Sequence, residues 1–222
     1  MKYITFVPFF GEMTTKLMEI EEKKLKILEG AGKLILKYGV KSMTMDDISR
    51  ELGISKKTLY QYVEDKNDLI KQIMQMDVEV DHGKICHIIE RNLNAIEESF
   101  EIFKSILENM GDVPPNILYD LKKYHPEAYA LHKDFMWAFS KNCLEENLSK
   151  GIKEGYYRED LNITVVAIGF ILMMINVCEN PEPWKGLHPV DVYKEIFQYH
   201  IHAVASNKGK KYLTEKYSSM NF

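Results

Sequence analysis

Hydrophobic positions recur along most of the chain at steps of three and four residues, the period of an amphipathic α-helix. The first such stripe begins after Glu21 and stops before Gly39, a residue type that often follows a helix end. Its apolar positions are Leu25, Ile27, Leu28, Ala31, Leu34, Ile35 and Tyr38. No segment shows the alternating pattern of a half-buried strand. The pattern therefore predicts an all-α fold.

Two short helices are predicted directly after the first. Thr44 precedes Asp47 by three residues, the spacing of a capping box, and Gly53 marks the end of that helix. Ser55 can cap the next helix, over about 56–62. Two short capped helices separated by a glycine-containing turn are typical of a helix-turn-helix.

Longer helices follow. Asp65 and Asp68 can cap one that continues through Leu69 and Ile73. Further predicted helices cover 84–109, a short segment from Pro114, 126–150, 161–178 and 190–205. The chain thus consists of a small head joined to a larger helical bundle. The four expected parts are a tail at 1–20, the head at 21–66, the body at 67–205 and a polar, frayed tail at 206–222. The alternative for the first part is an over-extended start before Met13 or Met18.

Charge is distributed unevenly between head and body. The 222 residues carry a net charge of -4 and are 45% hydrophobic, enough for a substantial core. Residues 21–71 hold 11 Lys/Arg against 9 Asp/Glu, whereas residues 72–222 hold 16 against 22. A modestly basic head suits a protein whose head meets a polyanion, although imbalances this small also occur in ordinary proteins.

Cysteine usage and hydropathy exclude several classes of protein. Cys86, Cys143 and Cys178 are odd in number and widely spaced, which favours neither a disulfide framework nor a zinc site. We therefore expect a cytoplasmic protein. The longest apolar run, 163–178, is shorter than a membrane span requires, so we expect a buried helix there and no membrane partner.

The histidines and the motif content argue against metal binding and catalysis. His82 and His87 lie five residues apart, and His200 and His202 two apart, so neither pair has the spacing of ligands on one helical face. There is no glycine-rich phosphate loop and no nucleophile elbow. We expect no metal, no cofactor and no enzymatic activity.

The stretch "GISKKTLYQYVEDK", residues 53–66, concentrates cations and hydroxyls on the second helix of the predicted motif. In a helix-turn-helix, the N-terminal residues of this helix reach base edges in the DNA major groove. Lys56 and Lys57 lie in its first turn, where the interaction of a cation with the helix macrodipole is unfavourable by a few tenths of a kcal/mol each. Contact with a DNA phosphate would make the net interaction of these charges favourable.

These residues also resemble a known family. Residues 27–70, "ILEGAGKLILKYGVKSMTMDDISRELGISKKTLYQYVEDKNDLI", are similar to the N-terminal domain of the tetracycline-repressor (TetR) family of bacterial transcriptional regulators. The similarity includes Tyr38-Gly39, the Thr44 cap and the "DDIS", "LGIS" and "TLY" segments. Beyond about residue 75 no motif matches. The resemblance implies a homodimer that places two recognition helices in successive major grooves, with a C-terminal domain that binds a small-molecule effector.

The resemblance also implies roles for single residues of the head. Thr44 and Lys66 correspond to phosphate contacts, although Thr44 has the alternative of acting only as a cap. Candidates for base-edge or adjacent phosphate contacts are Lys56, Lys57, Thr58 and Gln61. Tyr60 and Tyr62 are candidate backbone anchors, with partial burial in the core as the alternative for Tyr60. We assign Leu59 and Val63 to the core.

Candidate effector and dimer residues lie in the body. The candidates for an effector cavity are aromatic residues and methionines, which are also common in plain cores: Phe103, Tyr119, Tyr124, Phe135, Trp137, Phe139, Met173 and Met174. We expect a dimer contact from the apolar helix and the last predicted helix, through Ala167, Ile168, Ile171, Leu172, Ile175, Val192, Ile196, Tyr199 and Ala203.

Three classes of function remain open at this stage. The favoured one is a repressor that an effector, bound between about 84 and 178, releases from a pseudo-palindromic DNA operator. The release would act through the helix that starts at Lys66, which links the body to the recognition helix. The alternatives are a helical carrier of small molecules or an enzyme, and a helical adaptor that binds protein.

Overall fold

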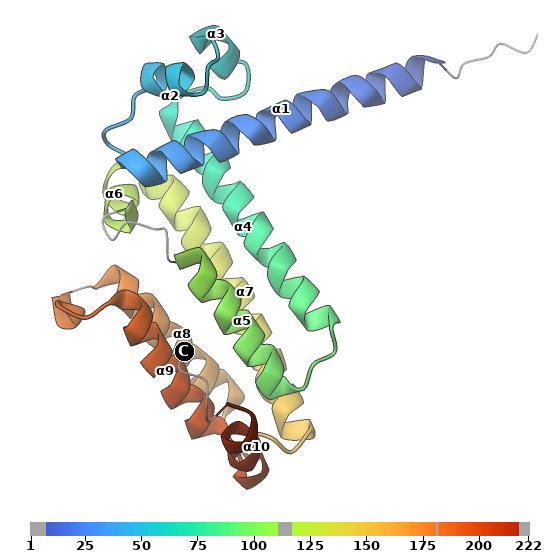
Figure 1. Cartoon of the computed structure of the whole chain (residues 1–222), viewed down its shortest axis with the longest axis vertical. Helices are drawn as coiled ribbons and strands as arrows, with labels where there is room; N and C mark the ends of the chain where they lie inside the picture. Colours follow the sequence, from blue (N-terminus) through green and yellow to red (C-terminus); the bar gives the residue numbers. More distant parts are fainter. Residues whose placement is uncertain (1–7, 111–116, 181, 218–222) are drawn as a thin grey trace, which may run out of the picture. The chain divides into compact units, whose positions relative to one another are not determined.

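The computed structural model describes residues 8–110, 117–180 and 182–217 (Figure 1). Over these residues the chain forms α-helices and one 3-10 helix and contains no β-strand, which confirms the all-α prediction. The elements are α1 (Pro8–Tyr38), α2 (Met45–Glu51), α3 (Lys56–Leu59), α4 (Lys66–Glu90), α5 (Ala95–Met110), α6 (Ile117–Tyr124), α7 (Pro126–Lys153), α8 (Ile163–Glu179), η1 (Glu182–Trp184), α9 (Pro189–Val204) and α10 (Asn207–Tyr217).

The chain divides into two compact units, Met1–Met76 and Asp77–Phe222. The division falls inside α4, whereas we expected a boundary after residue 66. The reason is that the first turns of α4 belong to the core of the head: Leu69 is fully buried there, and Ile73 packs against the same cluster. The head therefore includes the start of α4.

The core of the N-terminal unit forms where α1, α2, α3 and α4 present their apolar stripes. Ile27, Leu28 and Ala31 of α1 meet Ile48 of α2 and Leu59 of α3. Each of these side chains is almost completely removed from water, which stabilises the unit by about 2 kcal/mol for a large aliphatic side chain.

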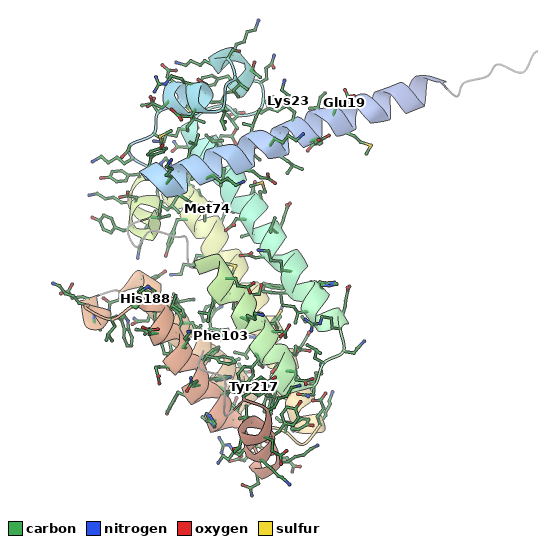
Figure 2. The ribbon with its side chains drawn as sticks, viewed as in Figure 1. Glu19, Lys23, Met74, Phe103, His188 and Tyr217 are labelled. Atoms are coloured by element: carbon green, nitrogen blue, oxygen red, sulfur yellow. The ribbon has the colours of Figure 1, made fainter. Side chains whose placement is uncertain are left out.

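The predicted tail at 1–20 is corrected by α1, which begins at Pro8; residues 1–7 lie outside the described residues. Proline suits the first turn of a helix because its missing N–H would have no intrahelical acceptor there. The following segment is rich in Glu, Lys, Leu and Met, which are good helix formers. Glu22 and Lys26, one turn apart, form an ion pair at 2.6 Å. Lys23 and Glu19 are labelled on this part of α1 (Figure 2).

The predicted helix over 84–109 is divided in the structure. α4 ends at Glu90, and α5 begins at Ala95. Between them Asn92 has a φ of 52°, a left-handed conformation that asparagine tolerates better than most residues. The Asn94 side chain then accepts a hydrogen bond from the Glu97 N–H at 3.1 Å and so caps α5.

In the C-terminal unit, α5, α7, α8 and α9 lie side by side (Figure 1). Aromatic side chains pack α5 against α9 and α10. The rings of Phe103 and Phe197 stack with their centroids 4.1 Å apart, and Phe100 stacks on Tyr217 at 3.9 Å. Phe103 and Tyr217 are both labelled in Figure 2.

A buried polar network joins α5, α7 and the segment after α7. The Asn147 amide donates to the Ala95 carbonyl at 3.0 Å and to the Glu98 carboxylate at 2.8 Å. Lys150 donates to the same carboxylate at 2.6 Å. Tyr157 is 1% exposed, and its hydroxyl donates to the Ala95 carbonyl at 3.0 Å. Burial raises the pKa of Tyr157, so this hydroxyl remains a donor.

The predicted polar tail at 206–222 is also corrected, because α10 occupies most of it; residues 218–222 lie outside the described residues. Ser206 accepts a hydrogen bond from the Gly209 N–H at 3.1 Å at the start of this helix. Gly209 lies so close to the Tyr156 carbonyl oxygen that a Cβ would collide with it. Leu213 is buried, so α10 belongs to the core of its unit.

The apolar α8 begins after Asn162, whose side chain accepts from the Val165 N–H at 3.1 Å. One side of the helix is buried, with Ala167 at 0% exposure, whereas Leu172 is 53% exposed. None of the helices in the described part of the chain is long and apolar enough to traverse a lipid bilayer.

Candidate nucleic-acid interface

The first helix of the motif, α2, is fixed by a capping box at Thr44. The Thr44 hydroxyl oxygen accepts a hydrogen bond from the Asp47 N–H at 3.2 Å, and the Asp47 carboxylate accepts from the Thr44 N–H at 3.1 Å. The Thr44 hydroxyl also donates to the Asp47 carboxylate at 2.5 Å, and this bond, the bond from the Thr44 N–H and the Arg50 guanidinium lower the pKa of Asp47. The capping role of Thr44 is confirmed. Its side chain is also exposed, so a phosphate contact remains a prediction.

Gly53 and Ser55 produce the turn that leads into α3. Gly53 has a φ of 65°, a conformation that side chains with a Cβ rarely adopt. Ser55 caps α3 by accepting from the Thr58 N–H at 3.0 Å. α3 itself ends at Leu59, earlier than the predicted 56–62, and a hydrogen-bonded turn continues the chain, with the Tyr62 N–H donating to the Leu59 carbonyl at 3.0 Å.

α3 and the turn after it have a buried side and an exposed side. Leu59 is 0% exposed and Val63 3%, as expected for core positions. The exposed side chains include those of Lys56, Lys57, Tyr60 and Gln61. Tyr60 is 43% exposed, so it is not a core residue, and its contact with the DNA backbone remains a prediction. Thr58, Tyr62 and Lys66 are half-buried. Four of the candidates for DNA contact are thus exposed on α3 and the turn after it.

The two lysines of the first turn differ in their surroundings. Lys56 forms an exposed ion pair with Asp46 of α2 at 2.6 Å, and its hydrogen bond to that carboxylate raises the pKa of the lysine. No ion pair to Lys57 is found among the described residues. Lys57 therefore presents the less compensated positive charge on this surface.

Lys66 has an internal partner that the sequence did not indicate. Its ammonium group donates to the Val40 carbonyl at 2.6 Å and so ties the start of α4 to the turn between α1 and α2. Burial lowers the pKa of this lysine. The two residues are 26 positions apart, too far for a helical spacing rule to connect them. The phosphate contact predicted for Lys66 would compete with, or add to, this structural bond.

Sequence reasoning missed Gln72, and assigned Asp68 only a capping role. The Asp68 carboxylate accepts from the Glu64 N–H at 2.8 Å, and the Gln72 amide donates to the Tyr62 carbonyl at 3.2 Å. Both bonds attach the turn after α3 to α4. The spacing of Asp65 and Asp68 gave a partial signal, whereas no local pattern marks Gln72.

The predicted effector residues that the structure describes differ in their exposure. Phe103 belongs to the aromatic core, Tyr119 is 62% exposed and Tyr124 39%. Trp137, Phe139 and Met174 are half-buried, and Met173 is 38% exposed. The side chain of Phe135 lies outside the described residues.

Two open hollows in the C-terminal unit are lined mainly by polar side chains. One, of about 680 Å³, follows α7 along Asn142, Glu145, Glu146, Ser149, Lys150, Lys153 and Glu154. The other, of about 280 Å³, lies between α4 and α5 and is lined by Lys84, His87, Ile88, Glu101, Lys104, Ser105 and Glu108. Neither includes a predicted effector residue. Within the described residues, no group of three or more His, Cys, Asp or Glu has a metal-binding arrangement.

The predicted dimer residues are corrected in part. Ala167, Ile171 and Val192 are 0%, 6% and 6% exposed within their own chain, so they are not available to a partner. Ala167 and Val192 belong to the hydrophobic core of the C-terminal unit. The remaining candidates are half-buried or exposed: Ile168, Ile175 and Ile196 are half-buried, and Leu172, Tyr199 and Ala203 are exposed. Val165, at 64% exposure, was missed.

Comparison with known families and curated proteins supports the helix-turn-helix assignment. Residues 27–73 match the family described as bacterial regulatory proteins, tetR family. The chain is 31% identical over 126 residues to the HTH-type transcriptional regulator YvaF of Bacillus subtilis, covering 54% of this chain and 65% of that protein. It is 37% identical over 62 residues to an HTH-type transcriptional regulator of Staphylococcus aureus (strain USA300), covering 28% and 34%. The alignments thus span less than two thirds of these relatives.

Solved structures share the fold over most of the chain. A putative transcriptional regulator from Saccharomonospora viridis in complex with choline has a TM-score of 0.68 at 18% identity, covering 84% of this chain and all of that one. A TetR-family regulator from Agrobacterium tumefaciens has a TM-score of 0.67 at 17% identity, covering 84% and 99%. The regulator AibR, in complex with isovaleryl coenzyme A and operator DNA, has a TM-score of 0.55 at 19% identity, covering 79% and 96%. Residues 27–73 thus match the helix-turn-helix segment of the tetR family of bacterial regulatory proteins, and the solved structures show that the all-α fold is shared over most of the chain.

Proposed function

We propose that this protein is a ligand-responsive transcriptional repressor that binds a pseudo-palindromic DNA operator as a homodimer and is released by a small-molecule effector. The observation that carries the proposal is the two-sided character of α3 and its following turn. Leu59 and Val63 anchor this segment in the core, while Lys57 and Gln61 remain exposed. A helix held in this way can insert its exposed side into a major groove.

The charges near α3 support contact with phosphate. Lys56 and Lys57 place two cations in a first helical turn, where the macrodipole disfavours them. DNA phosphates would compensate both charges and release counterions. We expect Lys57 and Gln61 to contribute to sequence preference, and Lys66, where it reaches a phosphate, to contribute about equally on any sequence.

A gel shift with the DNA flanking the gene of this protein, in the presence of random-sequence competitor, tests DNA binding. We expect a competitor-resistant complex with the wild type and a weaker one with Lys57→Ala. Lys210→Ala, an exposed lysine on α10, is the matched control and should bind like the wild type. Complete loss of the wild-type complex to random competitor would contradict the proposal.

Dimerisation supports the operator model because one short recognition helix reads few base pairs, whereas two-fold symmetry doubles the contacts. The exposed apolar residues of α8 and α9 provide the surface: Val165, Leu172, Met173 and Tyr199 are each at least 38% exposed. Large exposed apolar side chains that form one patch are typical of interaction surfaces.

Substitution at an exposed position tests this surface better than substitution at the buried Ile171. We expect Leu172→Lys to give a monomeric mass in light scattering, because a charge would be buried without a partner at the interface. Thr214→Lys, an exposed position on α10, should remain dimeric. A dimeric Leu172→Lys protein would exclude this surface.

Effector binding is proposed for the helices between about 84 and 178. The scattered aromatic candidates give no single ligand class, so the first probes are choline and isovaleryl coenzyme A, the ligands named for two structural neighbours. A probe that weakens operator binding a hundredfold must bind the DNA complex a hundredfold less tightly, a coupling of about 2.7 kcal/mol. Calorimetric titration into free and DNA-bound protein measures this; equal affinities would show that the probe regulates nothing.

A further inference from the structure

The recognition helix α3 is too short to fix the orientation of its side chains by itself. α3 contains four residues, Lys56–Leu59, and an isolated helix of this length has no stability in water. Tyr60 and Gln61, two candidates for DNA contact, already lie in the turn that follows. The direction in which these side chains point therefore depends on what holds the turn at its other end.

Two side chains of α4 hold that end of the turn. The Asp68 carboxylate Oδ2 accepts from the Glu64 N–H at 2.8 Å, and Gln72 Nε2 donates to the Tyr62 carbonyl at 3.2 Å. Gln72 Nε2 also donates to Asp68 Oδ2 at 2.9 Å, so the two side chains are linked. Asp68 in turn is fixed through its own N–H, which donates to Asp65 Oδ1 at 2.8 Å. We call this pair the Asp68–Gln72 clamp.

The orientation of the Gln72 amide is determined by its neighbours. Exchanging its oxygen and nitrogen would place Oε1 against the Tyr62 carbonyl and the Asp68 carboxylate, which are both acceptors. In the observed orientation Gln72 Oε1 is buried and has no hydrogen-bond partner among the described residues. A buried acceptor without a partner is costly. The Gln72 oxygen thus lies in an unfavourable position, while the Gln72 nitrogen donates the hydrogen bonds that hold the turn.

We propose that Gln72, acting with Asp68, is a positioning residue for sequence reading: it holds the turn after α3 so that Tyr60 and Gln61 meet the DNA in one orientation. The inference rests on the proposed DNA-binding function. Gln72 acts through the Tyr62 carbonyl and the Glu64 N–H, without itself touching DNA. Loss of the clamp leaves the charge of α3 in place, so binding to any DNA persists while discrimination between sequences falls.

Gln72→Glu tests the clamp with almost no change of shape. The new carboxylate faces two acceptors, so it repels the groups that Gln72 now binds. Gln75→Glu is the matched control, because it makes the same charge change at an exposed position of the same helix. Gln72→Met removes the hydrogen bonds without adding charge, and provides a second variant if Gln72→Glu fails to fold. Circular dichroism and light scattering establish that each variant is folded and has the wild-type mass.

The first readout is the ratio of affinities for two duplexes of equal length, one selected by the wild type from a randomised pool and one of random sequence. We expect Gln72→Glu to reduce this ratio at least tenfold, and Gln72→Met to reduce it less, while affinity for the random duplex changes less than threefold. Gln75→Glu should keep the wild-type ratio. A wild-type ratio in both Gln72 variants would overturn the inference and leave the proposed function intact. Absence of any preference in the wild type would contradict the proposed function itself.

The second readout needs no DNA. Hydrogen exchange in the free protein should be faster at the Glu64 N–H and in residues 60–63 in Gln72→Glu than in the wild type or in Gln75→Glu. Unchanged exchange there in both Gln72 variants would overturn the clamp, whatever the DNA measurements show.

Discussion

The two units of this protein are stabilised by contacts of different range. In the N-terminal unit the bonds that cap the two short helices of the motif join residues three positions apart, such as Thr44 with Asp47 and Ser55 with Thr58, whereas Lys66 with Val40 and Gln72 with Tyr62 are longer-range exceptions. In the C-terminal unit, polar bonds that are buried or partly buried span much longer separations: Asn147 and Glu98 are 49 positions apart, and Tyr212 and Glu97 are 115 apart. Local bonds leave a spacing in the sequence that can be recognised, whereas long-range bonds leave none. This difference explains why the motif was recognisable in one unit only.

The largest effect is expected in the buried network of the C-terminal unit. Asn147→Ala removes the donor to Ala95 and one donor to the buried Glu98 carboxylate. We expect a loss of about 3 kcal/mol in the free energy of unfolding, because the remaining groups stay buried without these partners. Urea denaturation measures it. Asn142→Ala, on the exposed side of the same helix, should change stability by less than about 0.5 kcal/mol. Equal effects at the two positions would show that the network contributes little.

An intermediate effect is expected from His200, which stacks on Phe170 in the C-terminal unit. Burial lowers its pKa to about 4, below the usual 6.5. Between pH 4 and pH 6.5 the histidine therefore binds a proton in the unfolded chain but not in the folded chain. The free energy of unfolding falls as the pH drops from about 6.5 to 4. Between pH 7 and pH 4.5 the wild type should lose about 2 kcal/mol more than His200→Leu. If the free energy of unfolding of the two proteins changed equally with pH, this would contradict a buried neutral histidine at position 200.

The smallest effect is expected at the local cap of the N-terminal unit. Thr44→Ala removes the acceptor for the Asp47 N–H, and should reduce stability by about 1 kcal/mol. Thr44→Ser keeps that hydroxyl oxygen and should restore most of the loss. Thermal unfolding of the three proteins measures the cap. If Thr44→Ser were as unstable as Thr44→Ala, the methyl group rather than the cap would account for the effect.

The sequence predicted the fold class, both short helices of the motif and the buried positions Leu59 and Val63, because helical period and capping residues act over a few positions. It did not predict the Lys66 bond to Val40 or the role of Gln72, because the partners come from other turns of the chain. It also placed Ala167, Ile171 and Val192 on a dimer surface. When a helix is apolar on more than one side, its sequence does not indicate which side packs against the core of its own chain. α10 was missed because a polar segment can still dock through a single buried leucine, Leu213.

The most direct test of the account is the affinity of the wild-type protein for its selected duplex relative to a random duplex of the same length, measured by fluorescence anisotropy at physiological salt. A dimer that reads two half-sites should bind the selected duplex at least about 10³-fold more tightly. Raising the salt concentration should weaken both complexes, because phosphate contacts contribute to each. Equal affinities for the two duplexes at every salt concentration would contradict the claim that this protein recognises an operator.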